Sequence, residues 1–224
     1  DDVYSRINVK RYGAVGDGVT DDTAAINAAT AAAYALNAGT LGVPVTTRTG
    51  GTIVYMPPGT YITSATINIY DNVILQGAGR FSTIISSSYN GPIVRNVLTN
   101  YDMVGCGVRD LCIKGDRTKT SQDGLSLLRD LQGTYSNVSI DRVGRYGAYI
   151  LQALGTQFIN FEAQECVGHG VYIKDGQNTW ADSTANNLPT NTVSFYDLHS
   201  AYNDGAGIYI GQTGSGANGA VNGV

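Results

Sequence analysis

The sequence predicts an all-β fold, a right-handed parallel β-helix closed at its N-terminal end by one capping α-helix. Three observations predict it: a glycine-centred segment that returns about every 23 residues, strict apolar–polar alternation inside that segment, and one Ala-rich stretch with helical spacing. Composition agrees, since only 14% of the 224 residues are charged, against an average of roughly 25%, and 29 glycines suit frequent turns.

The N-terminal segment is expected to form a short strand around Ile7 and Val9, then a Gly-rich loop, then a helix over residues 22–36. Asp21 and Asp22 stand at the helix start, where a carboxylate can accept from free backbone N–H groups and suits the helix dipole. The residues that recur at helical spacing form one narrow apolar face: Ala25, Ile26, Ala29, Ala33 and Leu36. We expect this face to cover the first coil of the β-helix.

The repeat comprises four segments of Gly-x-x-apolar character, which begin at Gly124, Gly147, Gly170 and Gly207. The first three glycines are 23 residues apart, and the last gap of 37 residues leaves room for a polar insertion around residues 178–191. A period near 23 built from short strands is what one coil of a β-solenoid needs.

Alternation within the repeat predicts which side chains face inward. The inward set comprises Leu125, Leu127, Ala148, Ile150, Val171, Ile173, Ile208 and Ile210. The outward set comprises Ser126, Tyr149, Tyr172 and Tyr209. Because coils stack at roughly 4.8 Å, the three tyrosines should form a ladder on one outer face.

The positions just before three repeat glycines hold Asp123, Tyr146 and His169, which we expect to stack along one outer edge. Asp123 and His169 would lie about 10 Å apart, slightly beyond the 5–9.5 Å of glycosidase carboxylate pairs. They are candidates for acid–base chemistry, with Tyr146 as a sugar-binding or acidic residue. The alternative is a polar turn column without chemistry.

A second strand in each coil places Ser139, Glu162 and His199 in one outward column. Glu162 is a candidate catalytic carboxylate. Glu165 aligns with Arg142 at the adjacent turn, where an exposed ion pair is the simpler interpretation.

Composition and motifs also restrict the function. The net charge of −4 disfavours nucleic acid as a partner. The sequence has no apolar run of about 18 residues, so membrane insertion is not expected. Zinc spacings, nucleophile elbows and phosphate loops are not found, so no metal or cofactor is expected. The odd number of cysteines predicts three buried free thiols, Cys106, Cys112 and Cys166.

Several motifs resemble the pectate-lyase-like β-helix superfamily, which includes polygalacturonases, alginate epimerases and phage tailspikes. They are GDGVTDDTAAINAA, GGTIVYMPPGTYIT, NVILQGAG and GVRDLCIKGD. The resemblance implies the fold and a polysaccharide site on the outer faces. The domain boundaries expected are 1–50 for the strand, loop and helix, and 51–224 for the coils. The Gly-rich end, 211–224, does not resemble a C-terminal cap, so we expect either that the natural protein continues or that a partner covers this end.

The reaction is less well defined by the resemblance. Gly168-His169-Gly170 is similar to a polygalacturonase motif, but the paired aspartates of those enzymes are absent. Alginate epimerases are more similar over residues 107–150, where Asp123 and Tyr146 fall on site residues. Tyr149, however, stands where their catalytic Asp should be, so their acid–base set is incomplete.

Together these features predict a phage tailspike or receptor-binding protein of the virion tail that binds and depolymerises a bacterial surface polysaccharide as a homotrimer. The predicted catalytic residues are Asp123, Glu162 and His169. The predicted carbohydrate-binding residues are Tyr146, Tyr149, Tyr172 and Tyr209. Two alternatives remain open: a non-catalytic structural β-helix of a tail or appendage, and a secreted bacterial polysaccharide lyase or epimerase.

Overall fold

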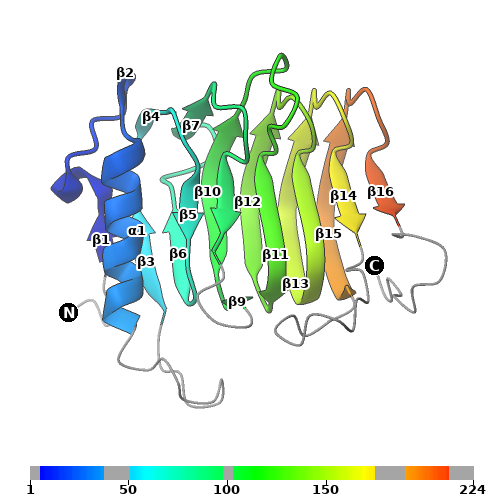
Figure 1. Cartoon of the computed structure of the whole chain (residues 1–224). Helices are drawn as coiled ribbons and strands as arrows, with labels where there is room; N and C mark the ends of the chain where they lie inside the picture. The colour runs from blue at the N-terminus through cyan, green and yellow to red at the C-terminus, as the bar shows by residue number, and fades with distance from the viewer. Residues whose placement is uncertain (1–5, 38–50, 98–102, 175–189, 212–224) are drawn as a thin grey trace, which may run out of the picture.

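The computed structural model describes residues 6–37, 51–97, 103–174 and 190–211, and shows a stack of parallel strands with one helix at its N-terminal end (Figure 1). Every strand pair in it is parallel, and the strands inside the stack pair with strands of the preceding and following coils. The predicted fold class, a right-handed parallel β-helix with an N-terminal capping α-helix, is confirmed. Most of the 178–191 insertion and nearly all of the Gly-rich end lie outside the described residues.

The coils have three faces, each a column of strands. The A face comprises β1 (Arg6–Asn8), β3 (Thr52–Tyr55), β6 (Val73–Gln76), the first halves of β10 (Gly107–Lys114), β12 (Thr134–Asp141) and β15 (Asn191–Ala201), and the middle of β13 (Ala148–Gln164). The B face comprises β2 (Asp17–Asp21), β4 (Gly59–Thr63), β7 (Thr83–Ser87) and the second halves of β10, β12, β13 and β15. The C face comprises β5 (Ile67–Ile69), β8 (Val94–Asn96), β9 (Met103–Val104), β11 (Leu125–Leu131), the first part of β13, β14 (Val171–Lys174) and β16 (Ile208–Gly211).

The capping helix α1 (Thr23–Asn37) follows β2 and a short 3-10 turn, η1 (Val9–Tyr12). Ile26, Ala29 and Ala33 are fully buried against the first coil, as predicted, whereas Leu36 is 63% exposed. Leu36 lies in the last turn of the helix, so its assignment to the buried face was wrong.

The two aspartates at the helix start have different partners. Asp21 accepts the backbone N–H of Thr23 (3.0 Å), and its pKa falls to about 2, first through the Ser64 hydroxyl and then through Thr23. The Asp22 carboxylate instead accepts from the N–H groups of Val15 and Gly16 in the preceding loop. Only Asp21 therefore caps through its side chain, and Asp22 fixes the loop.

The bend between the A and B faces is formed by residues with left-handed backbone. Asp110, Asn137, Asn160 and Asp197 all have φ between 48° and 59°, a region that Asn and Asp tolerate best among residues with a side chain. The side chains of the first three form a ladder: Asn137 donates to Asp110 (2.9 Å), and Asn160 donates to Asn137 (3.1 Å). This ladder keeps the bends of successive coils aligned.

The predicted inward residues of the C face are fully buried in β11, β13 and β14. Ile208 and Ile210 of β16 are 40% and 47% exposed, because β16 belongs to the last coil that the structure describes. All three cysteines are free, as predicted, and Cys106 and Cys166 are buried, whereas Cys112 is only partly buried, which corrects its predicted burial. Burial raises the pKa of Cys112 to about 11 and that of Cys166 to about 12, so both stay protonated and unreactive.

Candidate functional site

The B–C corner and the first residues of the C face carry an aromatic column, which we define as Tyr146, Tyr149, His169, Tyr172 and Tyr209. The strand register pairs Tyr149 with Tyr172 and Tyr172 with Tyr209, so the predicted tyrosine ladder is present. Two ring arrangements alternate along it. The His169 ring is parallel to that of Tyr146 (5.5 Å between centroids) and to that of Tyr209 (4.5 Å), while Tyr172 meets its neighbours edge-on.

His169 is oriented by the turn of the next coil. Its Nδ1 accepts the backbone N–H of Ala206 at 2.9 Å. Because Nδ1 is occupied as an acceptor, the proton of the neutral ring lies on Nε2. His169 therefore offers a hydrogen-bond donor.

Asp123 lies in the predicted register but not on the predicted edge. Its side chain is 0% exposed, and it accepts from Arg145 Nε (2.8 Å) and Nη2 (2.5 Å) and from the Tyr146 N–H (3.3 Å). Burial raises the pKa of Asp123, and Arg145 partly opposes that rise. The expectation of a carboxylate on a solvated edge was therefore wrong, because Arg145 occupies the outer position.

Arg145 connects the buried carboxylate to the aromatic column. Its side chain is 39% exposed, and its Cζ lies 5.1 Å from the Tyr146 ring centroid and 5.6 Å from that of Tyr149. Such contacts combine a cation with ring faces. Burial also raises the pKa of Tyr149 and Tyr172, so both hydroxyls stay protonated and can donate.

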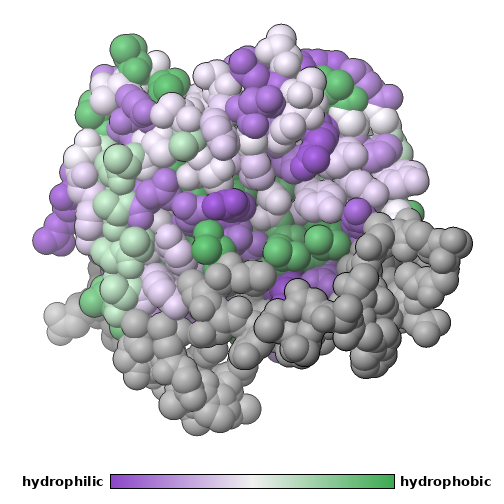
Figure 2. All heavy atoms as spheres, viewed as in Figure 1, coloured by the Kyte–Doolittle hydropathy of each residue, from purple (hydrophilic) through white to green (hydrophobic). Residues whose placement is uncertain are grey.

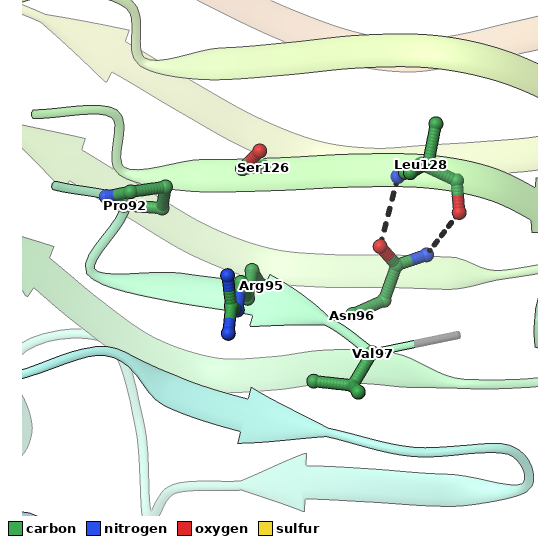
Figure 3. A pocket seen from close by; sticks show the side chains of 6 residues that line it. All are labelled: Pro92, Arg95, Asn96, Val97, Ser126 and Leu128. Carbon is green, nitrogen blue, oxygen red and sulfur yellow. Dashed lines mark hydrogen bonds between the residues drawn. The ribbon is translucent and has the colours of Figure 1, made fainter. Parts of the chain in front are cut away.

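The outward row of the C face continues from Tyr149 toward the N-terminus. Ser126 pairs with Tyr149 and with Arg95, and Arg95 pairs with Asn68, which accepts from its Nε at 3.0 Å. A cavity of about 340 Å³ opens beside Ser126 (Figure 3). Its lining comprises Pro92, Arg95, Asn96, Val97, Ser126 and Leu128.

The cavity wall is held by Asn96. The Asn96 amide donates to the Leu128 carbonyl (2.9 Å) and accepts the Leu128 N–H (2.8 Å), so a side chain replaces a strand pairing there. Figure 2 shows this side of the molecule, where the surface over β11 to β14 is mostly pale or purple, with hydrophobic residues in smaller patches. The C face thus offers a polar, aromatic row with a hollow at one end.

Sequence reasoning missed Arg145, Arg95 and Asn68. Arg145 directly precedes Tyr146, and the buried position of Asp123 was the signal for it, since a buried carboxylate needs a cation nearby. Arg95 and Asn68 lie in coils whose spacing differs from 23 residues, so the repeat did not align them with Ser126.

The other predicted residues lie on the B face, apart from the aromatic column. Glu162 pairs in register with Ser139 and His199, as expected, and His199 Nδ1 lies 3.1 Å from its carboxylate. Glu165 forms the expected ion pair with Arg142 (3.3 Å), and both side chains are about half exposed. Glu162 is therefore not part of one site with Asp123 and His169.

Two searches of the described residues gave negative results. No group of three or more His, Cys, Asp or Glu side chains is placed to hold a metal ion. Helix α1, the single α-helix in the described ranges, lacks the length and hydrophobicity to cross a membrane.

The described strands form a parallel β-helix, and comparison with known proteins supports its resemblance to pectate-lyase-like proteins. A family model described as "Rhamnogalacturonase A/epimerase, pectate lyase-like" matches residues 6–107.

Curated relatives include two enzymes of Azotobacter vinelandii. Mannuronan C5-epimerase AlgE6 is 37% identical over 152 residues, which cover 61% of this chain and 16% of the relative. Alginate lyase 7 is 34% identical over 155 residues, which cover 61% of this chain and 16% of the relative. The chain thus matches less than a fifth of the length of either protein.

Solved structures extend the similarity over nearly the whole chain. ORF18 of Geobacillus virus E2 matches with a TM-score of 0.67 and 26% identity, covering 92% of this chain and 40% of that protein. The A-module of Azotobacter vinelandii mannuronan C-5 epimerase AlgE4 matches with a TM-score of 0.62 and 24% identity, covering 90% and 59%. The second match supports the fold alone.

Proposed function

We propose that this chain is the polysaccharide-binding β-helix of a virion tail protein, which holds a bacterial surface polysaccharide along the C face and depolymerises it. One observation carries the proposal: a single outward row of Asn68, Arg95, Ser126, Tyr149, Tyr172 and Tyr209 crosses successive coils. Such a row runs along the axis of the β-helix, so consecutive sugars of an extended chain could lie on consecutive coils.

The chemistry of the row suits sugars. Tyrosine rings offer flat apolar surfaces for the C–H faces of sugars, while their protonated hydroxyls donate to sugar oxygens. Arg95 adds a cation beside the cavity, which favours a polysaccharide with acidic groups. The relatives support this class of ligand, because their names describe enzymes that act on mannuronan and alginate. The viral neighbour supports a place in the virion, with an extracellular protein as the alternative.

Depolymerisation needs proton transfer at the glycosidic bond. His169 carries its proton on Nε2 and Tyr146 stacks against it, so these two residues are the proposed proton-transferring groups. Asp123 acts through Arg145, as a positioning residue. His169→Gln should abolish cleavage with little loss of binding, whereas Tyr172→Ala should weaken binding first.

Affinity electrophoresis in gels that contain polymannuronate, polygalacturonate or neutral dextran tests the binding. We expect the wild-type chain to be retarded by at least one acidic polymer and Tyr172→Ala to be retarded much less. Tyr202→Ala is the matched control, because Tyr202 is 81% exposed and lies outside the row. Equal retardation of Tyr172→Ala and Tyr202→Ala would contradict the proposed row.

The Azotobacter relatives favour a second candidate, a secreted polysaccharide lyase or epimerase. A lyase would leave unsaturated uronates that absorb ultraviolet light, and an epimerase would change the polymer's NMR spectrum without shortening it. A non-catalytic structural β-helix would cause neither change. The homotrimer is part of the tail proposal, and light scattering that shows a monomer at micromolar concentration would argue against it.

A further inference from the structure

The B face carries a second group of side chains, which we define as the Glu162 cluster: Arg80, Phe81, Ser139, Glu162 and His199. The Glu162 side chain is only 14% exposed and has three partners from three parts of the chain. They are the Ser139 hydroxyl (3.2 Å), His199 Nδ1 (3.1 Å) and Arg80 Nη1 (3.5 Å). The carboxylate is thus used to orient other groups and has little surface of its own.

His199 is held in a defined tautomer by this contact. Because a carboxylate only accepts, the proton of the neutral ring lies on Nδ1, between the two residues. The His199 side chain is 63% exposed, which leaves Nε2 on the solvent side as an acceptor. A histidine oriented by a carboxylate in this way is the arrangement used for a general base.

Arg80 comes from a distant part of the β-helix. The loop between β6 and β7 carries it, and main-chain bonds anchor that loop: Gly77 N–H to the Arg109 carbonyl (3.0 Å) and Gly79 N–H to that of Asp110 (2.8 Å). Glu162 lies three coils further along, roughly 14 Å by coil spacing. The loop leans over the next coil, and the Arg80 side chain covers the rest of this distance and also contacts Asn160 (3.5 Å).

Phe81 completes the cluster. Its side chain is 82% exposed, and the Arg80 Cζ lies 5.1 Å from its ring centroid. The exposed part of this ring is available to pack against the C–H face of a sugar.

We propose that the Glu162 cluster is a second carbohydrate site, separate from the C face. The site takes an oligosaccharide along the B face: one sugar ring packs on Phe81, a hydroxyl of another sugar donates to His199 Nε2, and Arg80 donates to a sugar oxygen. Glu162 touches neither the sugar ring nor solvent extensively, so it is a positioning residue. The inference rests on the proposed function for its ligand class, but it uses different residues on a different face.

The chain has two histidines, one in each site, so each can report on its own surface. We would follow the Hε1 proton resonances of His169 and His199 by NMR while adding maltohexaose, hexamannuronate or hexagalacturonate. Saturable movement of the His199 resonance with at least one hexasaccharide is expected. Arg80→Gln and Phe81→Ala should weaken the affinity measured from the His199 resonance at least tenfold and leave the His169 response unchanged. The control Tyr202→Ala should leave both responses unchanged.

The outcomes separate the two proposals. If His169 responds and His199 does not respond to any of the three sugars, the second site is wrong and the C-face proposal stands. If only His199 responds, the C-face proposal fails. Should Arg80→Gln lower the unfolding free energy without altering the His199 response, the arginine is a structural latch and the second site is overturned.

The tautomer of His199 tests the positioning role of Glu162, because it would not depend on Glu162 if that residue only stabilised the fold. Nitrogen-15 shifts of His199 should show the proton on Nδ1 in the wild-type chain and a mixture of tautomers in Glu162→Gln. An unchanged tautomer in that variant would remove Glu162 from its positioning role.

Discussion

The aromatic column and the Glu162 cluster lie on different faces of one β-helix, yet they hold their histidines in opposite tautomers. His169 Nδ1 accepts from a backbone N–H of the next turn, so its proton lies on Nε2. His199 Nδ1 faces a carboxylate, so its proton lies on Nδ1. Backbone stacking is the same in both regions, and the difference arises from what the adjacent coil presents, a turn amide or an acidic side chain.

The two regions also treat their carboxylates differently. Asp123 is fully buried and tied to Arg145, which reaches the surface in its place, whereas Glu162 keeps a small exposed edge among three partners. A β-helix thus has two ways to bring a carboxylate to an outer face: through an arginine above it, or directly with a neighbour that orients it. The predictions below test this contrast in order of expected effect.

The largest effect concerns Asp130, a carboxylate that is fully buried with neutral donors only. It accepts from Thr156 (2.8 Å), Cys106 (3.0 Å) and Tyr135 (3.2 Å), and burial raises its pKa from 3.8 to about 6. Between these values the folded chain binds a proton that the unfolded chain has lost, so unfolding free energy falls as pH rises. The fall amounts to about 3 kcal/mol, since one pKa unit corresponds to about 1.4 kcal/mol.

Chemical denaturation at several pH values between 4 and 7 checks this expectation. Asp130→Asn should flatten most of the dependence, because its amide does not titrate. Asp123, whose pKa burial also raises, should contribute a remaining slope of the same sign. Parallel curves for Asp130→Asn and the wild-type chain would show that Asp130 titrates normally in the fold.

The second effect concerns the Asp123–Arg145 pair. Asp123→Asn leaves Arg145 without its counter-charge, which costs 3–5 kcal/mol in a fully buried pair. Because Arg145 is 39% exposed and can turn to water, we expect a loss of about 2 kcal/mol in unfolding free energy. Polysaccharide binding should weaken too, since Arg145 would no longer be fixed over Tyr146 and Tyr149.

A double-mutant cycle isolates this pair. Arg145→Gln alone leaves a buried carboxylate, and Asp123→Asn with Arg145→Gln should recover part of the stability that either single change removes. Strict additivity of the two losses would mean that the ion pair has no coupling energy.

The third effect separates ring from hydroxyl in the aromatic column. Tyr172 has ring contacts with Tyr146 (4.9 Å), Tyr149 (5.6 Å), His169 (5.7 Å) and Tyr209 (5.2 Å). Tyr172→Ala should weaken polysaccharide binding about tenfold, or about 1.4 kcal/mol, whereas Tyr172→Phe should keep most of it. Calorimetric titration measures both. Equal losses in the two variants would assign binding to the hydroxyl.

The sequence was sufficient for the fold because stacking repeats one pattern: apolar residues at every second strand position and Gly at the start of the C-face strand in successive coils. The same regularity correctly aligned Tyr149, Tyr172 and Tyr209, and Glu162 with His199. It could not predict that Asp123 points inward, because turn residues do not follow strand alternation. The contact of Arg80 with Glu162 could not be predicted either, because Arg80 precedes Glu162 by 82 residues and comes near it only when the coils stack.

The smallest effect concerns the Arg142–Glu165 pair, which tests whether burial explains the contrast between the two regions. The distance of 3.3 Å between Arg142 Nη1 and Glu165 Oε2 is that of an ion pair, but the two side chains are 51% and 41% exposed. The partners lie one coil apart, each with a left-handed backbone conformation. Water screens both charges, so Arg142→Ala and Glu165→Ala should each change unfolding free energy by less than about 0.5 kcal/mol. Removing both should give the sum of the single effects.

Denaturant unfolding of the four chains of this cycle, run beside the Asp123–Arg145 cycle at the same pH and salt, measures the two couplings together. A coupling for Arg142–Glu165 as large as that for Asp123–Arg145 would mean that the geometry of the coil turns sets the strength of these pairs, and that burial of Asp123 does not.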